Sequence, residues 1–243
     1  MSQLAENLEK LETAIADACR RAGRRRDDVE LMAVSKTYPA ETIAEAASLG
    51  LTLFGENRVQ EFSGKAAELV SLRTREEKPF RVHLIGHLQS NKAARAVELF
   101  DAVDSVDSLR LAQRLNDAAG KLGKRLPVLV EVKLSPEKTK EGLEPESRDA
   151  AELFEALLNL ANLEMRGLMT IAPWGAAEDV TRACFRSLRD WRDRWAAMHS
   201  RLNFGVLSMG MSGDFALAIA EGATRIRVGT ALFGKRAPYT GPV

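Results

Sequence analysis

The stretch 31–54, LMAVSKTYPAETIAEAASLGLTLF, decides the fold because it holds one complete structural repeat. A short apolar run at 31–35 is followed by a helical pattern at 40–49, and a second apolar run begins at 51. Short apolar strands that alternate with helices in this way form β-α-β units with parallel strands. The stretch therefore predicts an α/β protein.

The same alternation continues to the end of the chain. Strands are predicted at 31–35, 51–54, 81–85, 102–105, 128–133, 164–169, 205–208 and 225–228, and helices between them at 40–49, 91–99, 109–119, 150–160, 180–199 and 214–221. The helix at 180–199 carries an apolar stripe that we expect to be buried, formed by Val180, Cys184, Leu188, Trp191, Trp195 and Met198. Eight strands at about 30 residues per unit are the count of a (β/α)8 TIM barrel.

Two further features complete the predicted architecture. Apolar residues recur at helical spacing from Leu4 to Ile15, so an extra helix at 2–21 precedes the barrel, and 1–28 form this helix and its connection. No linker rich in Pro or Gly divides the chain, so residues 1–243 are expected to form a single domain. A doubly wound open sheet is the alternative, but it would need a GxGxxG motif after the first strand, where none occurs.

The composition argues against several classes of protein. The 243 residues include 35 Lys and Arg against 34 Asp and Glu, a net charge of +1, which gives no general attraction to nucleic acid or to an anionic membrane. No apolar run approaches the ~20 residues of a membrane span. Cys19 and Cys184 have no CxxC spacing, and the acidic residues among the first 26 do not suit a secretory signal. We therefore expect a cytoplasmic protein with no nucleic-acid or membrane partner.

Lys36 directly follows the first predicted strand. In TIM barrels the chemistry lies at the C-terminal ends of the strands, which places this side chain at the barrel mouth. Apolar surroundings there would lower the pKa of the lysine and leave a nucleophilic amine, as a Schiff base with a carbonyl compound requires. The alternative is a lysine that caps the barrel rim and reaches solvent.

Glycine-rich turns follow the seventh and eighth strands, LSMGMSG at 207–213 and RVGTA at 227–231. The loops after these two strands are the usual phosphate site of such barrels, because glycine brings backbone N–H groups close to the anion and Ser and Thr add hydroxyl donors. The alternative is ordinary turn chemistry, with Ser212 as a helix cap and Gly229 as a steric necessity.

The eighth strand, 225–228, reads RIRV. Period two places its apolar residues against the outer helices and turns Arg225 and Arg227 into the barrel. An inward arginine needs an anion or another acceptor. Arg227 is nearer the mouth and is the candidate for ligand binding, whereas Arg225 is expected to pair inside the barrel with Glu131 of the fifth strand.

Two other strand ends carry polar side chains. Asn57 follows the second strand and is placed to reach a ligand, although a helix cap would use the same residue. His83 and His87 are four residues apart, which on a strand separates them by about 13 Å. Because the chain also contains no HExxH or CxxC motif, we expect no metal site.

A lysine amine, a phosphate cradle and an inward arginine together fit a phosphorylated aldehyde, and pyridoxal 5′-phosphate (PLP) is the obvious candidate. Several segments also resemble the YggS/PROSC family of PLP homeostasis proteins. They are AVSKT at 33–37, FGEN at 54–57, HLIGHLQSNK at 83–92, RGLMTI at 166–171, LSMGMS at 207–212 and RVGTALFG at 227–234. The resemblance runs in order over nearly the whole chain.

The resemblance implies a single barrel similar to the barrel domain of alanine racemase, without the second domain of that enzyme. It implies that Lys36 forms the internal aldimine with PLP, that Arg227 lies at the pyridine nitrogen and that Asn57 lies beside the ring. Around the phosphate it implies Ser208, the backbone of Met209, Ser212, Gly229 and Thr230. The family often has Asp where this chain has Gly213, and since Asp214 follows at once, we expect only a local difference in the loop.

The function that the resemblance implies is intracellular PLP (vitamin B6) homeostasis, in which the protein stores or delivers the cofactor without efficient turnover. The alternatives are a stand-alone PLP-dependent amino-acid racemase and a Schiff-base aldolase. A racemase needs a second acid–base group opposite the lysine, and neither Tyr38 nor Tyr239 is an obvious one. An arginine at the ring nitrogen also disfavours protonation of the ring and weakens its electron sink. PLP-dependent apoenzymes are the expected partners, and a monomer is the expected state.

Overall fold

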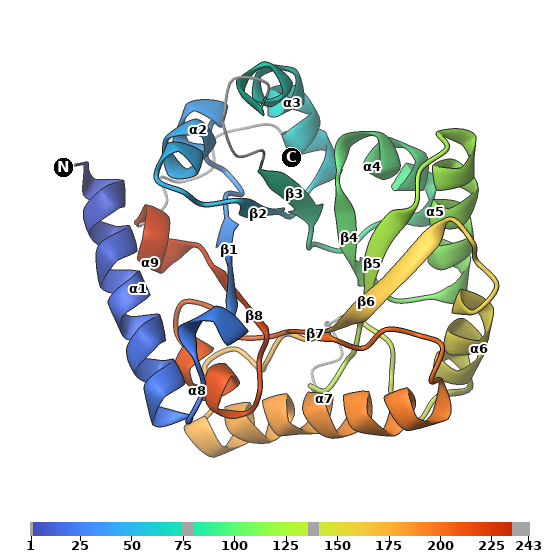
Figure 1. The fold of residues 1–243 in the computed structure, drawn as a ribbon. Coiled ribbons are helices and arrows are strands. Elements are labelled where there is room, and N and C mark those ends of the chain that lie inside the picture. Colours follow the sequence, from blue (N-terminus) through green and yellow to red (C-terminus); the bar gives the residue numbers. More distant parts are fainter. Residues whose placement is uncertain (1, 74–79, 136–140, 235–243) are drawn as a thin grey trace.

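Eight parallel strands close into a barrel in chain order (Figure 1) in the computed structural model, which describes residues 2–73, 80–135 and 141–234. The strands are β1 (Glu30–Val34), β2 (Leu53–Glu56), β3 (Arg81–Leu84), β4 (Ala102–Val106), β5 (Leu126–Glu131), β6 (Leu163–Met169), β7 (Val206–Ser208) and β8 (Arg225–Val228). β1 pairs with β8, from Glu30 opposite Arg225 to Ala33 opposite Val228, which closes the barrel. The predicted (β/α)8 fold is confirmed.

Helices surround the barrel (Figure 1), because a connection between two parallel neighbours must return the chain to the start of the next strand. They are α2 (Ala40–Ser48), α3 (Val59–Arg73), α4 (Ala93–Leu99), α5 (Leu109–Lys121), α6 (Arg148–Leu157), α7 (Glu178–Met198), α8 (Phe215–Ala220) and α9 (Thr230–Phe233), with short turns η1 (Arg26–Asp28) and η2 (Ser90–Lys92). The extra helix predicted before the first strand is α1 (Gln3–Arg21).

Apolar side chains fill two regions. The larger one lies between the strands and the surrounding helices and includes the fully buried rings of Phe54, Phe100 and Phe154. A small inner cluster, formed by Met32, Val34, Leu53 and Ile85, lies inside the barrel. Val34 and Ile85 also border the space at the C-terminal mouth, so this cluster forms part of the floor beneath it.

The N-terminal end of the barrel interior holds charged and polar side chains that contact one another. Arg225 Nη1 lies 3.0 Å from Asp104 Oδ2, Arg225 Nε lies 2.8 Å from Glu30 Oε2, and His83 Nδ1 lies 3.0 Å from Asp104 Oδ1. Arg225 thus points inward as predicted, but its predicted pairing with Glu131 is wrong. Arg225 begins β8 and is level with Glu30 at the start of β1, whereas Glu131 is the last residue of β5.

The apolar stripe of α7 is buried only in its middle. Cys184, Leu188 and Trp195 are buried, but Val180 is 45% exposed and Met198 is 63% exposed, so the predicted burial is wrong at both ends. The helix has 21 residues and is about 31 Å long, and the two exposed residues lie near its two ends. Its two ends therefore extend beyond the core.

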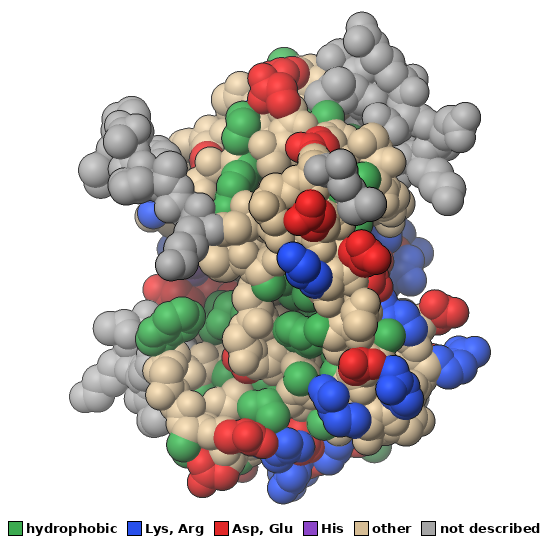
Figure 2. All heavy atoms as spheres, turned by 90° about the vertical axis from the view of Figure 1, so that its left-hand side faces the viewer, with side chains coloured by type: hydrophobic (Ala, Val, Ile, Leu, Met, Phe, Trp, Pro, Cys, Tyr) green, Lys and Arg blue, Asp and Glu red, His purple; other side chains and the backbone are tan. Residues whose placement is uncertain are grey.

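The face that carries α1 shows acidic and basic side chains interspersed (Figure 2). Mixed charge of this kind does not form the continuous basic strip that follows a nucleic-acid backbone. Within the described ranges, no helix combines the length and the apolar character needed to span a bilayer.

Candidate functional site

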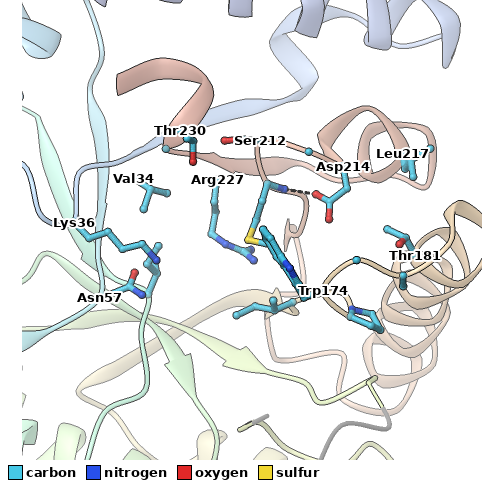
Figure 3. A pocket seen from close by; sticks show the side chains of 18 of the residues that line it. Val34, Lys36, Asn57, Trp174, Thr181, Ser212, Asp214, Leu217, Arg227 and Thr230 are labelled. Atoms are coloured by element: carbon cyan, nitrogen blue, oxygen red, sulfur yellow. Dashed lines mark hydrogen bonds between the residues drawn. The ribbon is translucent and has the colours of Figure 1, made fainter. Parts of the chain in front are cut away.

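A cavity of about 890 Å³ opens at the C-terminal mouth of the barrel (Figure 3). Small-molecule sites commonly measure about 300–1,000 Å³. The ends of β1, β2, β3, β6, β7 and β8 contribute to its wall, so the closed barrel brings together segments that are far apart in the chain. Six of the predicted site residues line it: Lys36, Asn57, Ser212, Arg227, Gly229 and Thr230.

Lys36 and Asn57 lie next to each other on one side of the cavity (Figure 3). Lys36 follows β1 and is half-buried, and Asn57 follows the neighbouring strand β2. The backbone of Asn57 packs tightly against Gly86 after β3, where a Cβ would approach the Asn57 carbonyl oxygen to 2.3 Å. Only glycine fits at this position, and the contact helps to fix Asn57 beside the lysine.

Arg227 lies between the lysine side and the opposite wall (Figure 3) and is almost completely buried. Its Nη1 donates to the carbonyl oxygen (2.7 Å) and the hydroxyl (2.9 Å) of Ser208, and its Nη2 donates to the carbonyl oxygen of Thr170 (2.9 Å). These bonds leave two of the five guanidinium N–H donors for a ligand. Burial lowers the pKa of Arg227, while the carboxylates of Glu131 and Asp104 oppose that shift.

The turns after β7 and β8 meet at the upper side of the cavity (Figure 3). The Ser212 hydroxyl accepts a hydrogen bond from the Ala231 N–H at 3.3 Å, which joins the two turns directly. Thr230 begins α9 and is exposed, and Gly229 packs against Val34 of β1, where a Cβ would lie 3.3 Å from the carbonyl oxygen. Two hydroxyl groups thus lie at the same side of the cavity.

Ser208 and Met209 lie elsewhere. Both are fully buried, and neither lines the cavity. The Ser208 hydroxyl is bonded to Arg227, and the Met209 N–H donates to the carbonyl oxygen of Arg225 at 3.1 Å. Their placement does not support the phosphate contacts expected for them, because β7 ends at Ser208 and both residues still belong to the packed barrel wall. Ser208 contributes instead by orienting Arg227.

Several lining residues escaped the sequence analysis. The most prominent is Trp174 in the loop after β6, whose side chain is 88% exposed although it borders the cavity opposite Lys36 (Figure 3). Thr181 of α7 and Leu217 of α8 line the same side. A tryptophan shortly after a barrel strand is the one signal that could have been noticed, since the helix residues look like any amphipathic face.

A smaller cavity of about 260 Å³ adjoins the first and shares Asn57, Ile85 and Ile171 with it. Glu131 lines this second cavity at the end of β5. Burial raises the pKa of Glu131 to about 7, although Arg227 acts in the opposite direction. Glu131 is therefore only partly ionised at neutral pH.

His87 lies beside acidic groups at the rim of the smaller cavity. Its Nδ1 is 3.2 Å from Asp107 Oδ2, and one ligand atom each of His87, Asp107 and Glu141 lie within 4.8 Å of one another. No motif in the sequence joins these three residues, because they follow three different strands, β3, β4 and β5. His87 and Glu141 are exposed, as acidic surface groups without a metal commonly are, and the expectation of no metal stays a prediction.

The fold and the position of this site define a class of protein. The chain matches the family model described as alanine racemase, N-terminal domain, over residues 7–237. That match covers the barrel from α1 to the end of α9.

The relatives narrow the class to one family. The chain is 44% identical to the pyridoxal phosphate homeostasis protein of Pseudomonas aeruginosa over 97% of both chains, and 41% identical to that of Aquifex aeolicus over 95% of this chain and 97% of the relative. A solved structure of PipY from Synechococcus elongatus with PLP bound is 43% identical, with a TM-score of 0.82 over 96% of this chain and 100% of that one. The chain belongs to the family of pyridoxal phosphate homeostasis proteins.

Proposed function

We propose that this chain binds PLP at Lys36 and serves PLP homeostasis by storing the cofactor or delivering it to PLP-dependent apoenzymes. The observation that carries the proposal is that one cavity holds a lysine amine, an inward arginine and two hydroxyl groups at the barrel mouth. The names of the relatives and the PLP bound to PipY support it.

The donor set of the cavity fits PLP. The aldehyde of this cofactor forms a reversible covalent bond with a primary amine, and its phosphate and ring nitrogen accept hydrogen bonds. Lys36 offers the amine, Ser212, Gly229 and Thr230 lie where they can surround the phosphate, and Arg227 has two spare donors for the ring nitrogen. Asn57 would lie beside the ring.

We infer that the protein is a carrier rather than an enzyme. Tyr38, the tyrosine nearest to Lys36 in the chain, donates its hydroxyl to the Gly234 carbonyl oxygen at 3.1 Å and does not line the cavity. It is therefore not placed to serve as a second acid–base group. Tyr239, the other tyrosine considered, lies outside the described residues. An arginine at the ring nitrogen favours the unprotonated ring, which withdraws electrons poorly.

We further propose that residues 1–243 form one cofactor-binding domain that acts as a monomer in the cytoplasm. One barrel with a common core supports the single domain. Both cysteines are buried thiols, as is usual in a reducing compartment. Sedimentation velocity of the purified protein should give the mass of one chain, 26.7 kDa. A mass of twice that value would contradict the monomer.

The test of the proposal is a titration of apoprotein with PLP, followed by the absorption of the bound cofactor. Wild type should show the shifted band of a covalently held cofactor, and Lys36→Ala should lose it because the amine is gone. Lys133→Ala is the matched control, since Lys133 lines the adjoining cavity and lies 3.7 Å from Glu144. A band that survives in Lys36→Ala and disappears in Lys133→Ala would refute the assignment.

A further inference from the structure

The turn that follows Lys36 has an unusual backbone. Thr37 has φ +70°, the one non-glycine residue with positive φ in the described ranges. A β-branched residue avoids this region unless its surroundings hold it there, and such residues gather at functional sites. The Thr37 N–H donates to Glu61 Oε1 at 2.5 Å, so α3 holds the turn at this point.

Lys65, one helical turn further along α3, holds the same turn on both sides of Lys36. Its Nζ donates to the carbonyl oxygen of Ser35 at 3.2 Å and to that of Tyr38 at 2.9 Å. The Lys65 side chain is only 10% exposed. An ammonium group buried against two main-chain carbonyls fixes the backbone one residue before and two residues after the lysine of the site.

The charge of Lys65 is balanced locally. Its Nζ lies 2.7 Å from Glu56 Oε1 and 3.7 Å from Glu61 Oε1, and the same Glu56 oxygen accepts from the Ser35 hydroxyl at 2.7 Å. Burial raises the pKa of Glu56, and the nearby Lys65 ammonium opposes that shift. Lys65 and Glu56 therefore depend on each other for burial.

This cluster lies behind the cavity and outside it. Along β2, Gly55 faces the barrel interior, where a Cβ would approach Met32 Sδ to 2.8 Å, so its neighbour Glu56 faces outward towards α3. Lys65 does not line the cavity. Its three N–H donors are engaged by Ser35, Tyr38 and Glu56, so Lys65 is not a competing amine for a ligand.

We propose that Lys65, supported by Glu56 and Glu61, is a positioning residue that sets the backbone of the turn 35–38 and thereby aims the Lys36 amine into the cavity. The inference rests on the proposed binding of PLP at Lys36. It assigns to α3 a role in covalent attachment of the cofactor that is separate from contacts to the cofactor itself.

The experiment compares two probes on Lys65→Met, which removes the ammonium and keeps most of the side-chain length. PLP reports covalent attachment by absorption, and pyridoxine 5′-phosphate, which has no aldehyde, reports occupation of the cavity by calorimetry. Lys65→Met should weaken attachment of PLP by about tenfold or more, the scale for loss of a hydrogen bond to a charged group. Binding of pyridoxine 5′-phosphate should change less than twofold, and Lys65→Arg should recover part of the attachment.

Lys124→Met is the matched control. Lys124 Nζ also donates to two main-chain carbonyls, of Val97 at 2.5 Å and Phe100 at 3.3 Å, but it does not touch the turn 35–38. This variant should lose thermal stability without changing either probe. Glu61→Ala removes the acceptor of the Thr37 N–H and should lower PLP attachment in the same direction, which keeps the inference testable if Lys65→Met does not fold.

Three results separate the two proposals. If wild type itself forms no covalent bond with PLP, the proposed function fails. If wild type forms it and Lys65→Met or Glu61→Ala attaches PLP as well as wild type, the positioning role is wrong. If Lys65→Met weakens both probes equally, Lys65 is only structural and the inference is also overturned.

Discussion

Glu131 and Arg227 are buried at the barrel mouth and interact electrostatically. Protonation of the Glu131 carboxyl group therefore changes the charge of the site. Burial raises the pKa of Glu131 from 4.5 to about 7 in the folded protein. Between these two pH values the folded state binds more protons than the unfolded state. The free energy of unfolding therefore falls as pH rises through this window.

Glu131→Gln should remove this pH dependence, because the amide is neutral at every pH. Relative to the variant, wild type should lose roughly 3 kcal/mol of unfolding free energy between pH 4.5 and pH 8. Urea denaturation of both proteins at the two pH values measures the difference, and titrations common to both cancel. An unchanged stability difference at the two pH values would mean that folding leaves the pKa of Glu131 unshifted.

The two hydroxyl groups at the joined turns should select for the phosphate. Ser212→Ala together with Thr230→Ala should weaken PLP far more than unphosphorylated pyridoxal, since each lost donor to an anion costs roughly 1.5–3 kcal/mol. Ser208→Ala is the control, because its hydroxyl contacts Arg227 and it should affect both ligands alike. Competition binding measures the affinity of each variant for PLP and for pyridoxal. Equal weakening by the double substitution would show that these hydroxyls do not hold the phosphate.

Residue-level prediction from the sequence succeeded where periodicity sets the direction of a side chain and failed where partners come from distant strands. Period two correctly turned Arg225 and Arg227 inward. The partners of Arg225 depend on the height of each residue along the barrel axis, which the sequence does not state. Lys65 was missed because its role depends on the path of the turn 35–38.

Among the elements, α7 and α8 are joined by one buried carboxylate at the end of α8. Glu221 accepts hydrogen bonds from Arg182 at 3.3 Å and Arg186 at 3.1 Å, and Arg189 donates to its carbonyl oxygen at 3.2 Å. Burial alone would raise the pKa of Glu221, but the hydrogen bonds from Arg186 and Arg182 outweigh it and hold the pKa below its usual range. The turn at 209–214 leads directly into α8.

Glu221→Gln should destabilise the protein by about 1–2 kcal/mol, a value reduced from that of a buried pair because the arginines are partly exposed. Glu178→Gln is the comparison, since Glu178 is 69% exposed and also pairs with Arg182, and it should cost about 0.5 kcal/mol or less. Thermal or chemical denaturation of both variants measures the two losses of unfolding free energy. If the two variants lose the same unfolding free energy, Glu221 does not contribute more than an exposed ion pair to the contact between α7 and α8.

Apolar patterning located every strand but misplaced some ends. The second strand was predicted at 51–54 and lies at Leu53–Glu56, because Gly55 and Glu56 are not apolar and yet belong to the sheet. Gly55 is needed where the interior is crowded, and Glu56 is buried through its contacts with Ser35 and Lys65. Neither reason can be seen in a hydrophobic pattern.

At the scale of the whole molecule, the described residues form one barrel with α1 packed beside α8 and α9 (Figure 1). Asn7 of α1 donates to the Leu232 carbonyl oxygen at 2.9 Å, which ties α1 to α9. The helix α1 therefore packs against α8 and α9, the two helices that follow the turns of the site. The repeat of strand and helix made this architecture predictable, whereas the two cavities depend on loop paths that no repeat describes.

A barrel with these residues should hold PLP without turning over amino acids. Cofactor-loaded protein incubated with L- or D-alanine in deuterated water should exchange the α-hydrogen far more slowly than an ordinary enzyme, whose rates are on the order of 1 s⁻¹ or faster. The reasons are that Tyr38 bonds the Gly234 carbonyl oxygen and does not line the cavity, and that an arginine at the ring nitrogen weakens the electron sink of the ring. Sustained exchange at enzyme rates would restore the racemase alternative.

The central claim is that Lys36 is the residue that bonds the cofactor. The most direct measurement is reduction of the PLP-loaded protein with borohydride, followed by digestion and mass spectrometry of the labelled peptide. We expect a single pyridoxyl label, on Lys36, and an unlabelled protein when Lys36→Ala is treated in the same way. A label recovered on Lys133 or Lys65, with Lys36 unmodified, would contradict it.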